Sequence, residues 1–522
     1  MALSLIDFFD KGVALGTDRP CLVCEGETLT YGEAQRSSYR MANALALAGI
    51  GPGTRIAVLG PNSARSFECV LGALRAGGTW VPVNARNAVE ETVYVLNHTD
   101  AEVLLYSVRF ADQVPGLLAR CPAVRLAVCT DGEGVAGHPR LDAWCADVPE
   151  ERRALHLDPE ALATLACSGG TTGFPKGVMT SHRTWAFRIA EVMQRLAHPA
   201  PVNLVAAPMT HGAGAGALEM MAMGAVHVVQ PGFDAAAIVD AIGRYGVTHM
   251  FLPPTALYRL LSEPTLRDGD FSSLSYLICG GAPIAPDRLR EASAVFGDAL
   301  HIGYGGTEFG GGICWMTGPD IARAIRDGDE QRLLSCGRPS PLSRVEIVGE
   351  DGRVLPPGET GEIVVNGYVL ASGYYKNPEE TAQSFREDGF YSGDIGFRDE
   401  DGWIFVSDRR KDMIISGGFN VYPSEVERVL MMHPAVQDCA VVGVADAYWG
   451  EAVTAVIELK AGASASDEEF GTLCRGHLAG YKVPKSFQTW DRLPRSPVGK
   501  VLKRAIRDAL SPAAASVARQ KA

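Results

Sequence analysis

Hydrophobic runs of strand length alternate with amphipathic windows of helical length over the first four hundred residues. The strand-like runs lie at 55–59, 103–106, 204–207, 226–229, 248–252 and 276–279. Because alternation of this kind is typical of βαβ units, it predicts layered helices with largely parallel sheets. Several runs end in glycine or proline turns, where ligands of open α/β sheets collect.

The pattern changes after Ser335. Short strand-like pieces at 345–348 and 361–365, separated by Asp-Gly and Pro-Gly turns, predict a β-rich subdomain. After the strand-like 403–406 and the charged run 408–412, the chain restarts with a smaller pattern. That pattern predicts helices at 423–432, 467–478 and 505–510, and strands at 437–444 and 452–459.

These patterns predict an α/β fold class with two domains. A large, multi-subdomain N-terminal domain of layered sheets and helices spans 1–408, and a small α+β C-terminal lid domain spans 409–522. A length of 522 residues also favours more than one domain. The net charge of −13 argues against a general partner role for nucleic acid or acidic membranes.

The chain carries no signal peptide that we can identify, because Asp7 and Asp10 interrupt its apolar start. The most apolar long stretch, 204–229, contains His211, Glu219 and glycines, so we expect no membrane span and a cytoplasmic location. Twelve cysteines are scattered along the chain, and Cys21-x-x-Cys24 is interpreted as a buried strand and turn. Free thiols fit a reducing compartment.

The segment 168–177 has the composition of a phosphate-binding loop. It reads Ser168-Gly169-Gly170-Thr171-Thr172-Gly173-Phe174-Pro175-Lys176-Gly177. Glycines allow backbone N–H groups to approach an anion, hydroxyls add donors, and Lys176 supplies a mobile positive charge. The spacing does not match the Walker A loop G-x-x-x-x-G-K-[ST], which disfavours an ordinary P-loop enzyme. ATP is the expected ligand.

Four further motifs follow in a diagnostic order. They are Tyr304-Gly305-Gly306-Thr307-Glu308, Tyr391-Ser392-Gly393-Asp394, Asp408-Arg409-Arg410-Lys411-Asp412 and Pro497-Val498-Gly499-Lys500. Together with the phosphate loop, they resemble the superfamily of adenylate-forming acyl ligases, which includes acyl-CoA synthetases, adenylation domains and luciferases. Supporting segments lie at 28–31, 75–84 and 500–504, so the resemblance covers nearly the whole chain.

The resemblance implies an ATP site assembled from several motifs. The β and γ phosphates would be held by Ser168, Gly169, Gly170, Thr171, Thr172, Gly173 and Lys176. The adenine slot would consist of Gly280, Gly281, Ala282, Pro283, Tyr304 and Gly305. Thr307 would hydrogen-bond the α-phosphate and Glu308 would hold Mg²⁺, a cation that prefers oxygen ligands. Asp394 would accept hydrogen bonds from the ribose hydroxyls, assisted by Arg409.

The resemblance also implies residues for the two half-reactions. Lys500 would reach between the acyl carboxylate and the α-phosphate, and His211 would lie near the acyl entrance. Gly417 and Gly418 would line the tunnel for the pantetheine arm of coenzyme A, and the lid would rotate about a hinge near Lys411. Small residues such as Gly214 are expected to leave a roomy acyl pocket. Met220, Met221, Met223, Phe309 and Trp315 would either line it or pack in the core.

The implied reaction converts a hydrophobic carboxylic acid, ATP and coenzyme A into acyl-CoA, AMP and pyrophosphate. An acyl-AMP ligase that serves an acyl-carrier protein or a separate transferase remains an alternative, as does a luciferase on the same scaffold. A catalytically silent relative is disfavoured because Lys176, Glu308, Asp394, Arg409 and Lys500 are all present. The identity of the acid and the oligomeric state, with a homodimer as one option, are left open.

Overall fold

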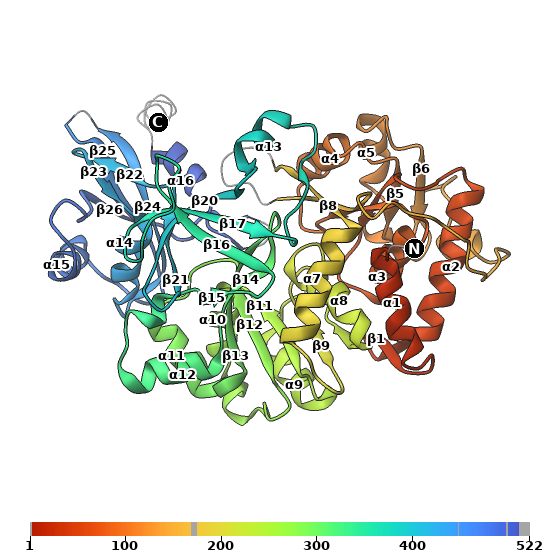
Figure 1. Cartoon of the computed structure of the whole chain (residues 1–522), viewed down its shortest axis with the longest axis horizontal. Helices are drawn as coiled ribbons and strands as arrows, with labels where there is room; N and C mark the ends of the chain where they lie inside the picture. The colour runs from red at the N-terminus through yellow and green to blue at the C-terminus, as the bar shows by residue number, and fades with distance from the viewer. Residues whose placement is uncertain (1–2, 169–174, 447, 497–498, 511–522) are drawn as a thin grey trace.

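The computed structural model describes residues 3–168, 175–446, 448–496 and 499–510, and Figure 1 shows their arrangement. Two large, mostly parallel sheets form the N-terminal part. The seven-stranded sheet has the order β18-β8-β7-β4-β3-β5-β6, and the nine-stranded sheet has the order β15-β14-β13-β12-β11-β9-β10-β1-β2. Parallel pairing runs through β4-β3-β5-β6 and through β13-β12-β11-β9-β10-β1, as the sequence predicted.

The strands of these two sheets have the following bounds. The seven-stranded sheet contains β3 (Arg55–Leu59), β4 (Thr79–Val83), β5 (Val103–Tyr106), β6 (Leu126–Cys129), β7 (Leu162–Cys167), β8 (Gly177–Ser181) and β18 (Gly373–Tyr374). The nine-stranded sheet contains β1 (Pro20–Cys24), β2 (Glu27–Thr30), β9 (Val202–Val205), β10 (Val226–Val229), β11 (His249–Leu252), β12 (Tyr276–Gly280), β13 (Leu300–Gly306), β14 (Gly310–Met316) and β15 (Arg338–Pro339).

Three helical layers cover the two sheets. The layer between them contains α1 (Leu5–Ala14), α2 (Tyr31–Leu47), α3 (Ala64–Arg75), α6 (Leu141–Trp144), α7 (His182–Arg195) and α8 (Gly212–Met220). The outer face of the seven-stranded sheet carries α4 (Val89–His98) and α5 (Val114–Arg120). The outer face of the nine-stranded sheet carries α9 (Ala235–Tyr245), α10 (Pro254–Leu261), α11 (Pro286–Phe296) and α12 (Gly318–Asp327).

Alternation along the buried strands explains this layering. In β3, Ile56 and Val58 pack into the central core, whereas Ala57 and Leu59 pack into the outer one. Successive side chains of a strand point to opposite faces, so a strand that is apolar throughout requires a helical layer on each side. The long hydrophobic runs of the sequence are therefore the direct cause of the five layers.

The β-rich subdomain predicted after Ser335 is a five-stranded antiparallel sheet. Its strands are β16 (Ser343–Val348), β17 (Gly361–Gly367), β19 (Phe385–Arg386), β20 (Gly389–Arg398) and β21 (Ile404–Arg409), and α13 (Pro378–Ser384) lies beside it. A two-residue strand, β18, leaves this region and pairs with β8 of the seven-stranded sheet. That pairing brings the phosphate-loop hairpin against residues from far along the chain.

The C-terminal part has its own sheet and core (Figure 1). It contains β22 (Ile414–Ser416), β23 (Phe419–Val421), β24 (Val436–Asp446), β25 (Gly450–Leu459) and β26 (Ser486–Thr489), with α14 (Pro423–Met431), α15 (Asp467–His477) and α16 (Lys503–Leu510). Val441 of β24 packs into the core beneath α14 and α15, and its neighbour Val442 packs against Ile506 of α16. A small α+β C-terminal domain is thus confirmed.

The predicted strands and helices occur within a few residues of their expected positions. The clearest shift is the run expected at 204–207, which forms β9 at Val202–Val205, because pairing with β10 ends at Val205 and Val229. Cys21 and Cys24 lie in β1 as unpaired thiols, as expected. Among the described residues, no helix combines the length and the apolar character needed to cross a membrane.

Candidate functional site

The two ends of the predicted phosphate loop are held together at the hairpin between β7 and β8. The backbone N–H of Ser168 donates to the carbonyl of Lys176 at 2.8 Å, and that of Lys176 donates to Oγ of Ser168 at 3.3 Å. The remaining residues predicted to bind phosphate lie outside the described residues: Gly169, Gly170, Thr171, Thr172 and Gly173.

A chain of contacts connects Lys176 to Glu308. The Lys176 ammonium forms an ion pair with Glu380 and lies 4.7 Å from the centre of the Tyr374 ring. Tyr374 in turn donates its hydroxyl hydrogen to Oε1 of Glu308 at 3.1 Å. Asn377 caps the start of α13 by accepting from the N–H of Glu380, which places the glutamate opposite the lysine. The loop lysine and the predicted metal ligand therefore share one neighbourhood.

Thr307 and Glu308 occupy the turn between β13 and β14, which a buried arginine supports. Arg188 of α7 is only 7% exposed; its Nε donates to the carbonyl of Val369 at 3.0 Å and its Nη2 to that of Thr307 at 3.2 Å. Burial lowers the Arg188 pKa to about 10, opposed by nearby carboxylates including Glu308, so the guanidinium stays charged at neutral pH. Arg188 thus fixes the backbone of this turn.

Glu308 fits the role of a magnesium ligand that works together with substrate phosphates. Within the described ranges, no three His, Cys, Asp or Glu side chains gather in the manner of an all-protein metal site. Mg²⁺ is commonly held by one or two carboxylates and by substrate phosphates. A single partly exposed carboxylate beside a phosphate-loop lysine matches that mode of binding.

Asp394 is the centre of a second cluster. It is 3% exposed, accepts the Tyr304 hydroxyl at 2.6 Å on Oδ2, and receives Nε of Arg409 at 2.6 Å on Oδ1. Asp394 and Arg409 are direct register partners on β20 and β21. The three predicted nucleotide-binding residues therefore form one hydrogen-bonded unit, and Asp394 keeps lone pairs for further donors.

The glycines near Tyr304 allow a close approach of neighbouring backbone. A Cβ on Gly280 would overlap the carbonyl of Gly303, and one on Gly305 would overlap that of Gly310. Gly281 has φ +89°, a conformation that favours glycine, and open space lies beside it. Ala282 and Pro283 follow on the surface. This flat, exposed backbone fits a planar base.

His211 lies at the N-terminus of α8, where its Nε2 is 3.2 Å from Nδ2 of Asn84. Burial, together with a smaller effect of the positive charge of Lys500, lowers the His211 pKa to about 4. The imidazole is therefore neutral at pH 7. The effect of Lys500 shows that the C-terminal lysine lies close enough to influence this part of the N-terminal domain.

Lys500 approaches the site from the C-terminal domain. A Cβ on the preceding Gly499 would lie 3.4 Å from Oγ1 of Thr255 in α10. Although the Lys500 side chain keeps access to solvent, the surrounding protein and the charge of Arg409 lower its pKa, whereas Asp394 and Glu308 raise it. The structure thus brings Lys500 near both of the carboxylates that the sequence assigned to ATP and Mg²⁺.

Gly417 and Gly418 form the turn between β22 and β23 and are exposed, with φ values of +59° and +81°. Lys411, at the predicted hinge, is also exposed as a residue. The protein that surrounds its ammonium and the charge of Arg409 lower its pKa to about 8. Lys500 lies near the site while Gly418 faces solvent. In this orientation of the C-terminal domain, therefore, Lys500 lies near the site and Gly418 does not.

The acyl-pocket prediction needs one correction. A Cβ on Gly214 would overlap the carbonyl of Met209, so Gly214 is a tight packing position and not a pocket wall. Gly216 of α8 and Gly311 of β14 instead have open space where a Cβ would stand. Met221 is buried in the central core, where its carbonyl meets Gly12 of α1.

Of the other apolar residues proposed for the pocket, two are buried and two are partly exposed. Met220 and Phe309 are buried, whereas Met223 and Trp315 are partly exposed. The Trp315 indole donates to the carbonyl of Gly312 and covers that glycine. Core packing therefore explains Met220 and Phe309.

A cavity of about 230 Å³ lies beside the His211 region. Asn84, the partner of His211, and Thr210, its neighbour, both line it. Arg86 and Arg109 contribute two exposed positive charges to its wall. Nε1 of Trp80, also in the lining, is buried without a hydrogen-bond partner among the described residues.

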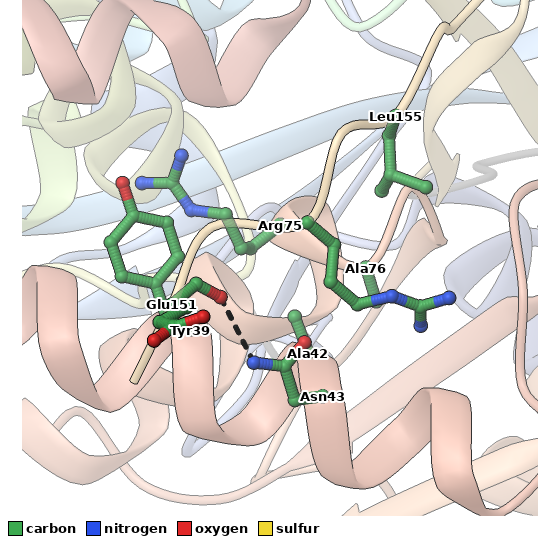
Figure 2. A pocket seen from close by; sticks show the side chains of 8 residues that line it. Tyr39, Ala42, Asn43, Arg75, Ala76, Glu151 and Leu155 are labelled. Atoms are coloured by element: carbon green, nitrogen blue, oxygen red, sulfur yellow. Dashed lines mark hydrogen bonds between the residues drawn. The ribbon is translucent and has the colours of Figure 1, made fainter. Parts of the chain in front are cut away.

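A much smaller hollow lies between α2, α3 and the segment around Glu151 (Figure 2). Asn43 Nδ2 donates to the Glu151 carbonyl at 3.0 Å, and Arg75 is held by Asp10 through two contacts of 2.6 Å. A volume of about 10 Å³ suffices for one water molecule at most. We interpret this hollow as a packing feature.

Sequence reasoning missed several residues that support the site. Arg188, Tyr374, Glu380 and Asn84 were not singled out. Arg188 carried no distinct signal, because the buried face of α7 also contains His182, Thr184 and Glu191. The other three lie in elements that meet the site only through tertiary packing.

Comparisons with known proteins agree with this geometry. A family model described as AMP-binding enzyme matches residues 9–375, and one described as AMP-binding enzyme C-terminal domain matches 425–500. A feruloyl-CoA synthase from Amycolatopsis sp is 37% identical over 485 residues, covering 92% of this chain and 94% of that protein. A fatty acid–acyl-carrier-protein ligase, ScoC from Streptomyces coeruleorubidus, is 33% identical over 497 residues, covering 94% and 93%.

Among solved structures, the amide bond synthetase McbA from Marinactinospora thermotolerans matches with a TM-score of 0.87 at 30% identity. The match covers 97% of this chain and 100% of that one. Two family models, relatives matched along nearly their whole length and a shared fold point to the same class. The chain belongs to the AMP-binding enzyme family of adenylate-forming ligases, and it is an acid–thiol ligase.

Proposed function

We propose that this enzyme activates a hydrophobic carboxylic acid with ATP and transfers the acyl group to the thiol of coenzyme A. The observation that carries the proposal is the hydrogen-bonded unit of Tyr304, Asp394 and Arg409, together with the effect of the Glu308, Asp394 and Arg409 charges on Lys500. Four separate motifs of the sequence would supply the charges needed to join a carboxylate to a nucleotide phosphate. The relatives named for feruloyl and fatty acids share the chemistry of a hydrophobic carboxylic acid.

In the first half-reaction, the acid oxygen attacks the α-phosphorus of ATP and pyrophosphate leaves. Lys500 would bridge the two anions with its ammonium, and Lys176 would bind the phosphates after exchanging its partner Glu380. Mg²⁺ held by Glu308 would neutralise charge on the phosphate oxygens. Asp394 would accept from the ribose, with Arg409 and Tyr304 keeping its carboxylate oriented.

In the second half-reaction, the thiol attacks the acyl carbonyl and AMP leaves. The cavity beside Asn84 supports coenzyme A as the thiol donor, because Arg86 and Arg109 provide charges for its phosphates. Gly418 would move to the site when the lid rotates near Lys411, with the domain boundary close to 408. The twelve free cysteines fit the cytoplasmic location that we propose.

The deciding experiment incubates the protein with ATP, Mg²⁺, coenzyme A and a panel of aliphatic and aromatic acids. Pyrophosphate and acyl-CoA are quantified separately. We expect both products with at least one hydrophobic acid. Pyrophosphate without acyl-CoA, together with acylation of an added carrier protein, would favour the alternative suggested by the carrier-protein ligase relative. Neither product with any acid would refute the proposal.

A further inference from the structure

Open space lies beside one glycine of α8 and one glycine of β14. A Cβ placed on Gly216 of α8 or on Gly311 of β14 would meet no atom within 4 Å. Gly212 and Gly216 are four residues apart and therefore lie on one face of α8. This glycine face is open at Gly216, whereas a Cβ on Gly212 would lie 3.3 Å from the Phe251 ring.

Glu219 continues the same face of α8, three residues beyond Gly216 and seven beyond Gly212. It is 8% exposed, yet its carboxyl group makes no hydrogen bond or ion pair with any described residue. Glu219 is therefore a buried carboxyl group on the glycine face of α8 with no hydrogen bond to a described residue.

Arg188, whose positive charge acts on Glu219, forms no hydrogen bond or ion pair with this carboxyl and donates elsewhere. Its Nε and Nη2 donate to the backbone carbonyls of Val369 and Thr307. The Glu219 pKa is raised to about 7. Burial is the main cause, the charge of Arg188 opposes it, and the charge of Glu191 adds to it. Near neutral pH the group is thus available both as an acceptor and as a donor.

The position of Glu219 sets a length scale for the acid. At a rise of 1.5 Å per residue, the Cα of Glu219 lies about 12 Å along the helix from the Cα of His211. His211 is the residue whose pKa is influenced by the charge of Lys500. An unbranched hydrocarbon end would leave a buried carboxyl unpaired, which is costly, whereas a hydroxyl group there would pair with it.

We infer that Glu219 determines specificity by binding a hydroxyl group at the far end of the acid, so that the enzyme prefers hydroxylated aromatic acids to plain hydrocarbon acids. This inference rests on the proposed function, since it concerns the acid used in the first half-reaction. A rigid acid such as 3-(4-hydroxyphenyl)propenoic acid has the required arrangement of a carboxylate at one end and a hydroxyl donor at the other.

The test compares that acid with 3-phenylpropenoic acid and with octanoic acid, using kcat/KM from pyrophosphate release. We expect the wild-type enzyme to favour the hydroxylated acid by at least about tenfold. Glu219→Leu should reduce the ratio to near one, mainly by slowing the hydroxylated acid, whereas Glu219→Gln should retain part of the preference. Glu68→Gln, a change at an equally buried carboxyl group of α3 that pairs with Arg65, serves as the matched control and should leave the ratio unchanged.

A wild-type ratio near one would overturn the inference even if Glu219→Leu proved unable to fold. A ratio that Glu219→Leu does not alter, or that Glu68→Gln alters equally, would overturn it as well. These outcomes leave the proposed function standing, because acids are still activated. Absence of pyrophosphate with every acid in the wild-type enzyme would instead refute the proposed function.

Discussion

Nε of Arg409 lies 2.6 Å from Oδ1 of Asp394, across a register pair that joins the last strand of the antiparallel sheet to its neighbour. Tyr304 reaches the other oxygen of the same carboxylate from the nine-stranded sheet. The contact thus ties the segment that leads into the C-terminal domain to the proposed nucleotide site.

Replacing Asp394 with Asn should weaken ATP binding more than it disturbs the fold. The change removes the charge that holds Arg409 and a strong acceptor for the ribose hydroxyls, so we expect KM for ATP to rise about tenfold to a hundredfold. Tyr304→Phe, which removes only the phenolic hydroxyl, is the control and should cost less. Kinetics at varied ATP will measure both; equal effects would contradict the central role of Asp394.

Lys500→Ala should separate the two half-reactions. Because Lys500 lies beside Glu308 and Asp394 while Gly418 faces solvent, adenylation should fall by at least about a hundredfold and thiolation of supplied acyl-AMP should largely persist. Pyrophosphate release and acyl-CoA formation from synthetic acyl-AMP are measured separately. A folded variant that loses both steps equally would exclude this division of roles.

The pH dependence of the first half-reaction should reflect the lowered Lys500 pKa. A lysine with a lowered pKa loses its positive charge at a lower pH than a free lysine, so adenylation should decline on the alkaline side earlier than free lysine titrates. Lys500→Arg keeps its charge there and should shift or remove the decline, whatever its absolute rate. Identical alkaline limbs in the two proteins would assign the titration to another group.

Two glycines on one helix provide a matched stability test. Gly214→Ala places a Cβ against the Met209 carbonyl and should cost more than about 2 kcal/mol of unfolding free energy. Gly216→Ala enters open space and should change it by less than about 1 kcal/mol, with a gain in helix propensity. Urea unfolding of both variants decides; comparable losses would show that Gly216 is also packed.

Arg109→Ala should impair the use of coenzyme A selectively. Arg109 lines the cavity beside Asn84, so losing its charge should raise KM for coenzyme A about tenfold while leaving acid-dependent pyrophosphate release unchanged. Arg120→Ala, which removes an arginine paired with Glu90 on the surface, serves as the control. A similar rise in both variants would point to general charge effects and away from this cavity.

The linear pattern of residues was sufficient to predict the layers, the β-rich subdomain and the small C-terminal domain. This is because the period of apolar positions determines which faces must be covered. The local motifs also pointed to the family, which the comparisons confirmed. Both kinds of information depend only on residues that are neighbours along the chain.

Tertiary structure alone decided which distant residues meet. It showed that Lys500 lies near Glu308 and Asp394, that Glu380 pairs with Lys176, and that Glu219 is buried without a hydrogen bond to any described residue. It also reversed the expectation for Gly214, since a glycine required by a neighbouring carbonyl and a glycine facing open space are identical in sequence. Such distinctions depend on separations between elements, and these are determined by packing of the whole chain.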